Sequence, residues 1–429
     1  MEIKDPVHGT ITLARDEVSV VDSAEFQRLR LIKQLGFSEF SFPGATHSRY
    51  LHSLGVCHMA GIAFDYIFKN YEFSTPEKRK RFRQVVRLAA LLHDIGHGPL
   101  SHATEEVMPP RSALNIQTYV HRKTPVPSEG KASHEDYTVK YITDSPLTDI
   151  LKKAFPDITP YHIVCLIDKT LELKDDFFTD NGLNFRTILS QMVSSEIDVD
   201  RMDYLGRDAY FCGTNYGHVE TNWLLSNFTF HVVEQEVYLA LNKRALYTFD
   251  DFLISRHHMY LMIYFHHKSI IYEEMLYRYL TSSDCKYQLP ADINQYTRCT
   301  DYSLYEHLAN SSNYWAQKIT QRQPFKVLFE NHVTHEDPKM NLLADQLRSS
   351  GIDFITASSQ ARLSKYHGGS QEDKSFQIFV IDEYSPRETP ITIDKCTQIF
   401  EMYEKTRRIE RIYVPSEVLD RAKKIRESL

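Results

Sequence analysis

The sequence lacks a long hydrophobic run. No stretch approaches the roughly 18 uncharged apolar residues that a membrane-spanning helix needs, and the N-terminal residues MEIKDPVHG contain no apolar signal-peptide core. The six cysteines are scattered and none forms a C-x-x-C pair, which argues against a disulfide framework or a structural zinc knuckle. We therefore expect a cytoplasmic protein with reduced thiols that does not engage a membrane.

Glycine, proline and net positive charge are also scarce. The 429 residues include only 15 Gly and 17 Pro, which favours helices over a turn-rich β architecture. The formal net charge is -7, so no overall basic field attracts nucleic acid, and we do not expect nucleic acid as a partner. With 42% hydrophobic and 25% charged residues, the chain has the composition of a globular protein with a sizeable core.

The pattern of the chain predicts a mainly α-helical protein in two parts. A helical core covers residues 1–285, and a smaller α+β lobe, which we expect to serve regulation or oligomerisation, covers residues 286–429. The polar stretch 281–300 makes the boundary between them.

Individual elements follow from hydrophobic periodicity. Helical patterns in the core cover residues 49–70, 77–94, 133–153, 160–173, 185–205, 221–228 and 249–280. A hairpin is expected at 237–248. In the lobe, residues 376–381 and 408–414 are typical of strands, with a helix near 391–406 between them.

The strongest chemical signal is the pair His93-Asp94 at the end of the apolar run Leu88–Leu92. A buried imidazole beside a buried carboxylate is costly unless something neutralises them, and a bound cation does so. His97 and His102 follow closely in the sequence. The stretch therefore predicts a metal site.

Two further side chains complete a candidate set of four metal ligands. His52 lies on an expected helix, and Asp200 lies in the acidic stretch 197–208. Helices can bring ligands from distant positions to one point. Imidazole and carboxylate suit one divalent transition metal such as iron, manganese or zinc, which can polarise phosphoryl oxygens for hydrolysis. Taken singly, these residues also fit ordinary roles: a core or surface histidine, and a solvated acidic face formed with Asp198 and Asp203.

The order H…HD…D, formed by His52, His93-Asp94 and Asp200, resembles that of the HD-domain metal-dependent phosphohydrolases. Longer motifs extend the resemblance from about Lys4 to Lys326: EFQRLR, KQLG, PGATHSRYLHSLG, LLHDIGHGPLSH, HED and DVDRMDYLGRD. They are similar to those of the deoxynucleoside triphosphate (dNTP) triphosphohydrolase branch, in particular the type named for its SAM and HD domains. We expect the HD core without a SAM domain in front of it.

The resemblance implies hydrolysis of dNTPs to a deoxynucleoside and inorganic triphosphate, with attack at the α-phosphorus and Mg²⁺ carried on the substrate phosphates. His102 matches the family's proton donor for the leaving 5′ oxygen, and Glu105, one helical turn later, can hold its ring. His97 and His134 match positions near the phosphates. We count these four residues as the predicted catalytic set.

Substrate contacts follow from the same resemblance. Arg49 can reach a phosphate bidentately, although a surface ion pair is the alternative for this side chain. Asp208 matches the carboxylate that accepts from the 3′-hydroxyl, and Tyr264 or Phe265 would close the sugar pocket. The predicted substrate-binding set is Gln34, Leu35, Arg49, Arg201, Tyr204, Asp208, Arg256 and Phe265.

An activator site is implied as well, because tetrameric relatives bind guanine nucleotides between subunits. We therefore expect a homo-oligomer, either a dimer or a tetramer, and a dNTP activator. The matching positions are Asp22, Gln27, Arg30, Lys243, His267, Lys268, Arg322 and Lys326. Lys4, Asn222 and Leu241 depart from the family pattern, so the identity of the activator, and the need for one, stay open.

Two other functions stay open on the residues alone. One is an HD phosphohydrolase that acts on a nucleoside monophosphate, a cyclic dinucleotide or a nucleic-acid end. The other is a non-catalytic nucleotide sensor. The complete ligand set, with His102 and His134 also present, favours an enzyme, because a sensor would tolerate the loss of at least one ligand.

Overall fold

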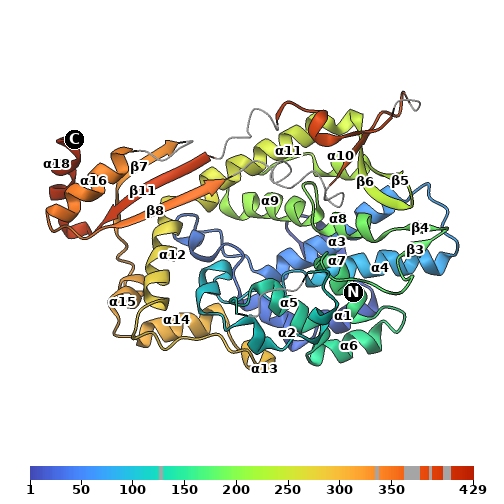
Figure 1. Ribbon diagram of the computed structural model, residues 1–429, viewed down its shortest axis with the longest axis horizontal. Helices are drawn as coiled ribbons and strands as arrows, with labels where there is room; N and C mark the ends of the chain where they lie inside the picture. Colours follow the sequence, from blue (N-terminus) through green and yellow to red (C-terminus); the bar gives the residue numbers. More distant parts are fainter. Residues whose placement is uncertain (125–128, 334–337, 362–376, 386–388, 400–406) are drawn as a thin grey trace.

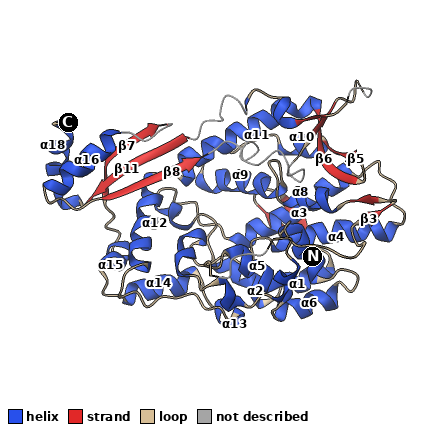
Figure 2. Cartoon of the chain, in the orientation of Figure 1, coloured by secondary structure: helices blue, strands red, loops and turns tan. Residues whose placement is uncertain are grey.

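The computed structural model describes residues 1–124, 129–333, 338–361, 377–385, 389–399 and 407–429. Within these ranges the molecule is mainly α-helical, and its strands form small sheets toward the edges (Figure 2). The predicted fold class is therefore confirmed. None of the helices in these ranges is both long and apolar enough to cross a bilayer.

The described helices and strands are as follows. The helices are α1 (Arg15–Val21), α2 (Ala24–Gln27), α3 (Arg49–Ile67), α4 (Pro76–Leu92), α5 (His134–Thr143), α6 (Pro146–Ala154), α7 (Pro160–Ile167), α8 (Arg186–Val193), α9 (Val199–Cys212), α10 (Thr221–Ser226), α11 (Leu246–Met259), α12 (His267–Leu280), α13 (Ile293–Tyr296), α14 (Asp301–Asn310), α15 (Tyr314–Thr320), α16 (Pro338–Ser349) and α18 (Leu419–Glu427). The strands are β1 (Glu2–Asp5), β2 (Gly9–Thr12), β3 (Thr179–Asp180), β4 (Leu183–Asn184), β5 (Phe228–Val233), β6 (Glu236–Asn242), β7 (Lys326–Val333), β8 (Ile355–Ala361), β9 (Phe379–Ile381), β10 (Ile391–Thr392) and β11 (Arg407–Val414).

Helices α3 and α4 form the centre of the helical core, and α9 packs against α3 (Figure 1). Thr75 caps the start of α4, and its side chain accepts a hydrogen bond from the backbone N–H of Lys78 at 3.1 Å. Pro76 occupies the first helical position. Its apolar end, Leu88–Leu92, is fully buried. The α3 helix is buried on almost every side, which fits its lack of a polar stripe.

Three of the long helices predicted from periodicity are divided. One divides at Ser145, whose side chain caps α6 just before Pro146. Another divides before Asp198, which caps α9. The third divides at a π-helical turn, Tyr260–Tyr264, and at His266, which caps α12. In each case a local cap or turn interrupts the predicted helix, although the apolar periodicity of the sequence continues past it.

Strands β5 and β6 form an antiparallel hairpin whose turn includes Glu234 in the left-handed region, with φ 57°. The hairpin starts at Phe228, earlier than the predicted range 237–248. The same β6 pairs in parallel with β4 and with β9, a strand from far later in the chain. A second hairpin, β1–β2, lies at the N-terminus.

The C-terminal lobe is built on the antiparallel sheet β7–β11–β8. Helices α16 and α18 cover it and enclose a separate small core, formed by Leu328, Leu343, Leu347, Ile412 and Val414 with their neighbours. The same sheet also packs against the main core, which includes Ile355, Ala357 and Tyr413. The sheet therefore contributes residues to both cores.

Three predictions concern the lobe's elements. The strand predicted at 408–414 is β11. The strand predicted at 376–381 is β9, found over Phe379–Ile381, and residue 376 lies outside the described residues. The helix predicted near 391–406 is wrong over 391–398, where β10, a short 3-10 turn and irregular backbone occur instead, and residue 399 is helical. Residues 400–406 lie outside the described ranges.

Candidate metal centre

The site is assembled where α3, the end of α4 and the start of α9 meet. His52 lies on α3 and is 1% exposed. The α4 helix ends at Leu92, so His93 and Asp94 lie at the turn that follows it. Asp200 lies in the first turn of α9.

The start of α9 is fixed by Asp198. Its Oδ1 accepts from the backbone N–H of Arg201 at 2.8 Å, and its Oδ2 accepts from the backbone N–H of Ser195 at 2.7 Å. Capping of this kind satisfies free N–H groups at a helix start. The cap therefore fixes the first turn of α9, which carries Asp200.

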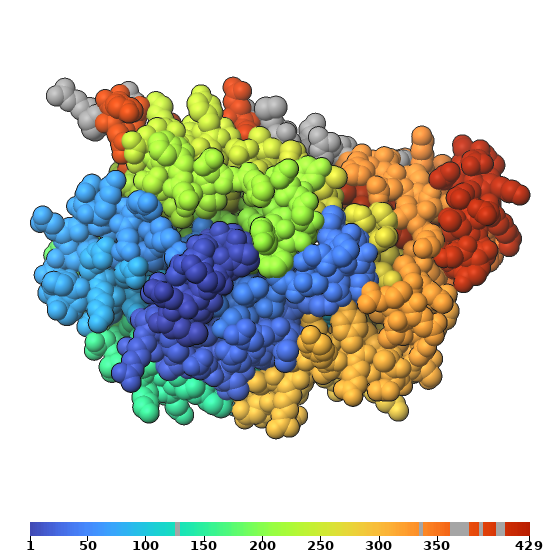
Figure 3. Space-filling view, turned by 180° about the vertical axis from the view of Figure 1, so that it is seen from behind, coloured from blue at the N-terminus to red at the C-terminus, as the bar shows by residue number. Residues whose placement is uncertain are grey.

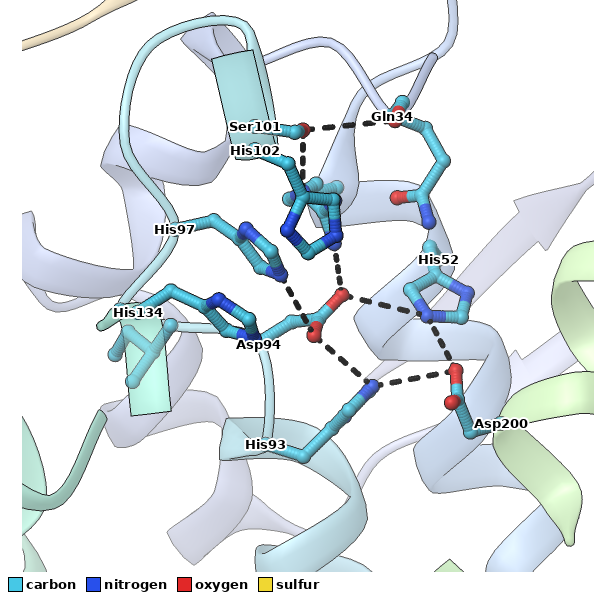
Figure 4. Close-up of polar contacts among 12 residues, drawn as sticks. Gln34, His52, His93, Asp94, His97, Ser101, His102, His134 and Asp200 are labelled. Carbon is cyan, nitrogen blue, oxygen red and sulfur yellow. Dashed lines mark hydrogen bonds and ion pairs between the residues drawn. The ribbon is translucent and has the colours of Figure 1, made fainter. Parts of the chain in front are cut away.

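Four side chains from these elements converge (Figure 4). Nε2 of His52 lies 3.0 Å from Oδ1 of Asp200 and 3.6 Å from Oδ2 of Asp94. Nε2 of His93 lies 3.4 Å from Oδ1 of Asp200 and 3.4 Å from Oδ1 of Asp94. Two imidazoles and two carboxylates therefore present ligand atoms to one small region.

The second nitrogen of each imidazole is already occupied. Nδ1 of His52 lies 2.8 Å from Oδ2 of Asp203, and Nδ1 of His93 lies 2.8 Å from the carbonyl oxygen of Ala90. Such outer contacts fix the tautomer of a metal-binding histidine. Nε2 of both rings is buried and has no hydrogen-bond partner among the described residues. These donors fit a divalent cation.

The local charges favour a cation at this point. Burial lowers the pKa of His52, but Asp200 and Asp203 outweigh that effect and raise it to about 10. Burial raises the pKa of Asp200, yet the adjacent His52 and His93 imidazoles hold it well below its ordinary value. Because metal ions compete with protons for such ligands, the same carboxylates would attract a divalent cation.

Three more histidines lie beside this centre (Figure 4). The rings of His97 and His134 stack with centroids 3.9 Å apart, and His102 meets both edge-on. Oε1 of Glu105 lies 2.6 Å from Nδ1 of His134 and 3.1 Å from Nδ1 of His102. Burial raises the pKa of Glu105, but these two imidazoles outweigh it and lower the pKa to about 2. The His102 side chain is 68% exposed and can meet a substrate.

The loop that connects the metal centre to His102 is held by an arginine from an earlier part of the chain. The Arg28 guanidinium donates to the carbonyl oxygens of His97 at 2.8 Å, Cys299 at 3.1 Å and Ile95 at 3.4 Å. Its cation also lies 4.6 Å from the centre of the Tyr296 ring. Sequence reasoning missed this role, although Arg28 lies within the EFQRLR motif.

Leu100 and Ser101 adopt left-handed backbone conformations, with φ of 53° and 59°. Such conformations are rare for non-glycine residues and cost about 1 kcal/mol or more each. Asp301 supports the turn, because its Oδ1 accepts from the N–H of Leu100 at 2.7 Å and its Oδ2 from the N–H of Lys33 at 2.9 Å. The turn precedes His102 directly, and the sequence contained no signal for Asp301.

Arg49 lies inside the centre. Its Nη1 pairs with Oδ2 of Asp94, and its Nε donates to Ser101 Oγ at 2.8 Å. Gln34 extends toward the same region in Figure 4, and its Oε1 is buried without a hydrogen-bond partner among the described residues. Leu35 packs against the main core.

The predicted sugar-binding residues form a second small group. Both carboxylate oxygens of Asp208 are engaged: Oδ1 lies 2.8 Å from Nε2 of His47, and Oδ2 accepts from the Tyr264 hydroxyl at 2.7 Å. The Tyr204 ring lies 6.3 Å from the Tyr264 ring. The structure thus brings Tyr264 rather than Phe265 to Asp208. The π-helical turn inserts one residue into the helical repeat, which accounts for this offset.

Two arginines of the predicted substrate-binding set are paired with carboxylates elsewhere. Arg201 pairs with Asp198 and with the carbonyl oxygen of Ser195. Arg256 donates to Oε2 of Glu196 at 3.1 Å. Both guanidinium groups therefore have carboxylate partners within the chain.

The predicted activator residues do not gather at one place in a single chain. Arg30 donates to Gln27 at 2.7 Å and lies over the Tyr50 ring. Arg322 lies over the Phe40 ring, at 3.5 Å from its centre. Lys243, between β6 and α11, pairs with Asp382 at 2.9 Å. The remaining positions are Asp22, at the end of α1, His267 and Lys268, at the start of α12, and Lys326, at the start of β7. Figure 1 shows β6 and β7 on opposite sides of the molecule.

Comparison with known families and proteins agrees with this geometry. The chain matches the HD domain over residues 49–208, a range that contains all four candidate ligands, and the HD associated region over residues 221–349. It is 34% identical to YwfO of Bacillus subtilis over 266 residues, covering 61% of this chain and 51% of that protein.

Other relatives carry an enzyme name. The chain is 27% identical over 361 residues to the human deoxynucleoside triphosphate triphosphohydrolase SAMHD1, covering 76% of this chain and 54% of that protein. The chain thus spans about half the length of the curated relatives it matches. A solved structure of a hypothetical protein from Aquifex aeolicus is similar over 99% of both chains, with a TM-score of 0.73 and 26% identity.

Proposed function

The chain belongs to the HD-domain proteins, and we propose that it is a metal-dependent phosphohydrolase that converts dNTPs into deoxynucleosides and inorganic triphosphate. The convergence of His52, His93, Asp94 and Asp200 beside an accessible histidine carries this proposal. Similarity to SAMHD1 supports the choice of dNTPs as substrate.

The four ligand candidates would hold one divalent ion, either iron, manganese or zinc, and further Mg²⁺ would arrive on the substrate phosphates. When bound, such ions polarise phosphoryl oxygens and neutralise the charge that develops during phosphoryl transfer.

The remaining residues would position the substrate and move a proton. We assign His102 as the general acid: a water oxygen attacks the α-phosphorus and releases a proton to solvent, the bond from that phosphorus to O5′ breaks, and the His102 imidazolium delivers its proton to O5′. The imidazole then regains a proton from solvent. Glu105 holds the His102 ring, because its Oε1 lies 3.1 Å from Nδ1 of that ring. His97, His134 and Arg49 would face the phosphates.

Sugar recognition would fall to the group around Asp208. Its carboxylate, held by Tyr264 and His47, would accept a hydrogen bond from the 3′-hydroxyl. The Tyr264 ring, packed against C2′, would disfavour the extra hydroxyl of a ribonucleotide. Binding of a dNTP activator between subunits of an oligomer is a further part of the proposal.

The decisive experiment is product identification. Purified protein is incubated with Mn²⁺ or Mg²⁺ and with dNTPs singly and in pairs, ribonucleotides, nucleoside monophosphates and cyclic dinucleotides, and the products are separated by ion chromatography. Inorganic triphosphate from dNTPs supports the proposal, and turnover only in pairs would identify an activator. Orthophosphate or pyrophosphate would indicate another HD phosphohydrolase, and nucleotide binding without turnover would indicate a sensor.

A further inference from the structure

A buried ion-pair network adjoins His52 on the side away from the other candidate ligands. Oδ2 of Asp203 lies 2.8 Å from Nδ1 of His52 and accepts from Nε of Arg207 at 2.9 Å. Oδ1 of Asp203 accepts from Nη2 of Arg207 at 2.9 Å and lies 2.6 Å from Nε2 of His8. Asp203 and Arg207 are both fully buried.

The network continues into the N-terminal hairpin. Nη1 of Arg207 donates to Oδ2 of Asp5 at 2.7 Å. Asp5 ends β1, and its Oδ1 accepts from the backbone N–H groups of Val7 and His8, so the same side chain also shapes the hairpin turn. Figure 3 shows the first residues of the chain, in the darkest blue, at the molecular surface. A surface hairpin is thereby linked to His52 through two buried carboxylates and one guanidinium.

The packing of α3 against α9 makes room for this network. A Cβ atom at Gly55 would lie 1.9 Å from Oδ1 of Asp203 and 2.4 Å from Nη2 of Arg207. Any other residue at position 55 would therefore force the ion pair out of place. Close approach of this kind is a physical reason for glycine inside a helix, where it otherwise costs stability.

We propose that Asp203 is a positioning residue of the metal centre, and that the β1–β2 hairpin, acting through Asp5 and Arg207, sets the affinity of that centre for a divalent cation. The inference rests on the proposed metal site. Asp203 accepts the Nδ1 proton of His52, so that Nε2 carries the lone pair toward the metal. Arg207 donates one hydrogen bond to each oxygen of the Asp203 carboxylate, and Asp5 in turn accepts from Arg207. Outer carboxylates of this kind typically change metal affinity by about 10–100-fold.

The test is a Mn²⁺ titration of the chelator-treated chain, followed by the electron paramagnetic resonance signal of free Mn²⁺. We expect Asp203→Ala to weaken Mn²⁺ binding by about 10–100-fold. Asp203→Asn, which keeps a neutral acceptor for His52, should recover part of that loss. Asp5→Asn leaves Asp203 in place and should weaken binding by a smaller factor, on the order of threefold to tenfold.

A matched control separates positioning from loss of stability. Asp168 and Arg122 form another carboxylate–guanidinium pair, with side chains 14% and 12% exposed, and its hydrogen bonds among the described residues involve neither the four candidate ligands nor the β1–β2 hairpin. Asp168→Ala should lower the unfolding temperature, yet leave Mn²⁺ affinity within about twofold. Titrations are made at a temperature where circular dichroism shows every variant folded.

The outcomes separate the inference from the proposed function. If the wild-type chain binds no Mn²⁺, the proposed metal site and this inference are both wrong. If the wild-type chain binds Mn²⁺ and Asp203→Ala binds it equally well, or if Asp168→Ala weakens binding as much, the positioning role alone is wrong. If Asp203→Ala weakens binding but Asp5→Asn does not, the proposed action of the hairpin through Asp5 and Arg207 is overturned.

Discussion

His93 and Asp94 are adjacent in the sequence and supply half of the candidate ligand set. Replacing both with alanine should reduce bound metal to a small fraction of the wild-type value and lower hydrolysis at least about 1000-fold, because the remaining two ligands cannot hold the ion. Inductively coupled plasma mass spectrometry and triphosphate release measure the two effects. His218→Ala, a change at an exposed histidine, is the control. Normal turnover in a metal-free double variant would contradict the assignment.

His102 is assigned a different task, so its loss should separate chemistry from metal binding. We expect His102→Ala to lower kcat by about 100- to 10,000-fold while metal content stays near that of the wild type. Parallel measurement of kcat and metal content checks this. Loss of metal in the variant would show instead that His102 supports the centre.

The low pKa of Glu105 makes a pH-dependent contribution to stability. The pKa of about 2 lies below the ordinary carboxyl value, so the ionised form stabilises the fold. The contribution is complete above about pH 4.5 and is lost as pH falls toward 2. Because the side chain is 34% exposed, we expect no more than about 1 kcal/mol. Urea unfolding of the wild type and Glu105→Gln at pH 7, 5, 4 and 3 should show a difference that shrinks with acidity; a constant difference would refute the assignment.

At the scale of elements, the π-helical turn decides which aromatic side chain meets Asp208. Tyr264→Phe removes a hydrogen bond to a buried carboxylate and should raise the KM for dNTPs by roughly threefold to tenfold. Steady-state kinetics compares this variant with Tyr260→Phe, which removes a hydroxyl that makes no hydrogen bond to Asp208 among the described contacts. A larger effect from Phe265→Leu than from Tyr264→Phe would mean that the helix keeps an ordinary repeat in solution.

The same element shows where sequence reasoning stops. The residue types and the motif order predicted four ligand candidates, and the structure brings His52, His93, Asp94 and Asp200 together. A π turn changes the register by one residue without a distinct sequence pattern, so Tyr264 and Phe265 could not be distinguished. Whether the centre binds metal remains a prediction.

Contacts to backbone atoms were also beyond the sequence. Arg28 acts on carbonyl groups, and Asp301 on N–H groups, of a loop that lies far away in the chain. Backbone groups are present at every residue, so no side-chain pattern identifies such partners. Their positions follow only from the tertiary fold.

At the scale of the whole molecule, the small core of the C-terminal lobe is separate from the core that holds the metal centre. Ile412→Ala should destabilise the lobe by about 2–5 kcal/mol and leave metal content unchanged. Leu88→Ala, a matched truncation in the main core close to His93, should lower both stability and metal content. Thermal unfolding and metal analysis test the pair. Equal loss of metal in both variants would show that the two cores are coupled.

The parallel pairing of β9 with β6 has a consequence for synthesis on the ribosome. All four candidate ligands and β6 itself emerge long before β9, and at ordinary elongation speeds the interval is on the order of ten seconds. During that time the segment Ala240–Asn242 of β6 lacks its parallel partner and offers free N–H and C=O groups to any neighbouring chain. Nascent copies on a crowded polysome would therefore be most vulnerable to aggregation in this interval, after the metal centre has been translated and before β9 can pair with that segment.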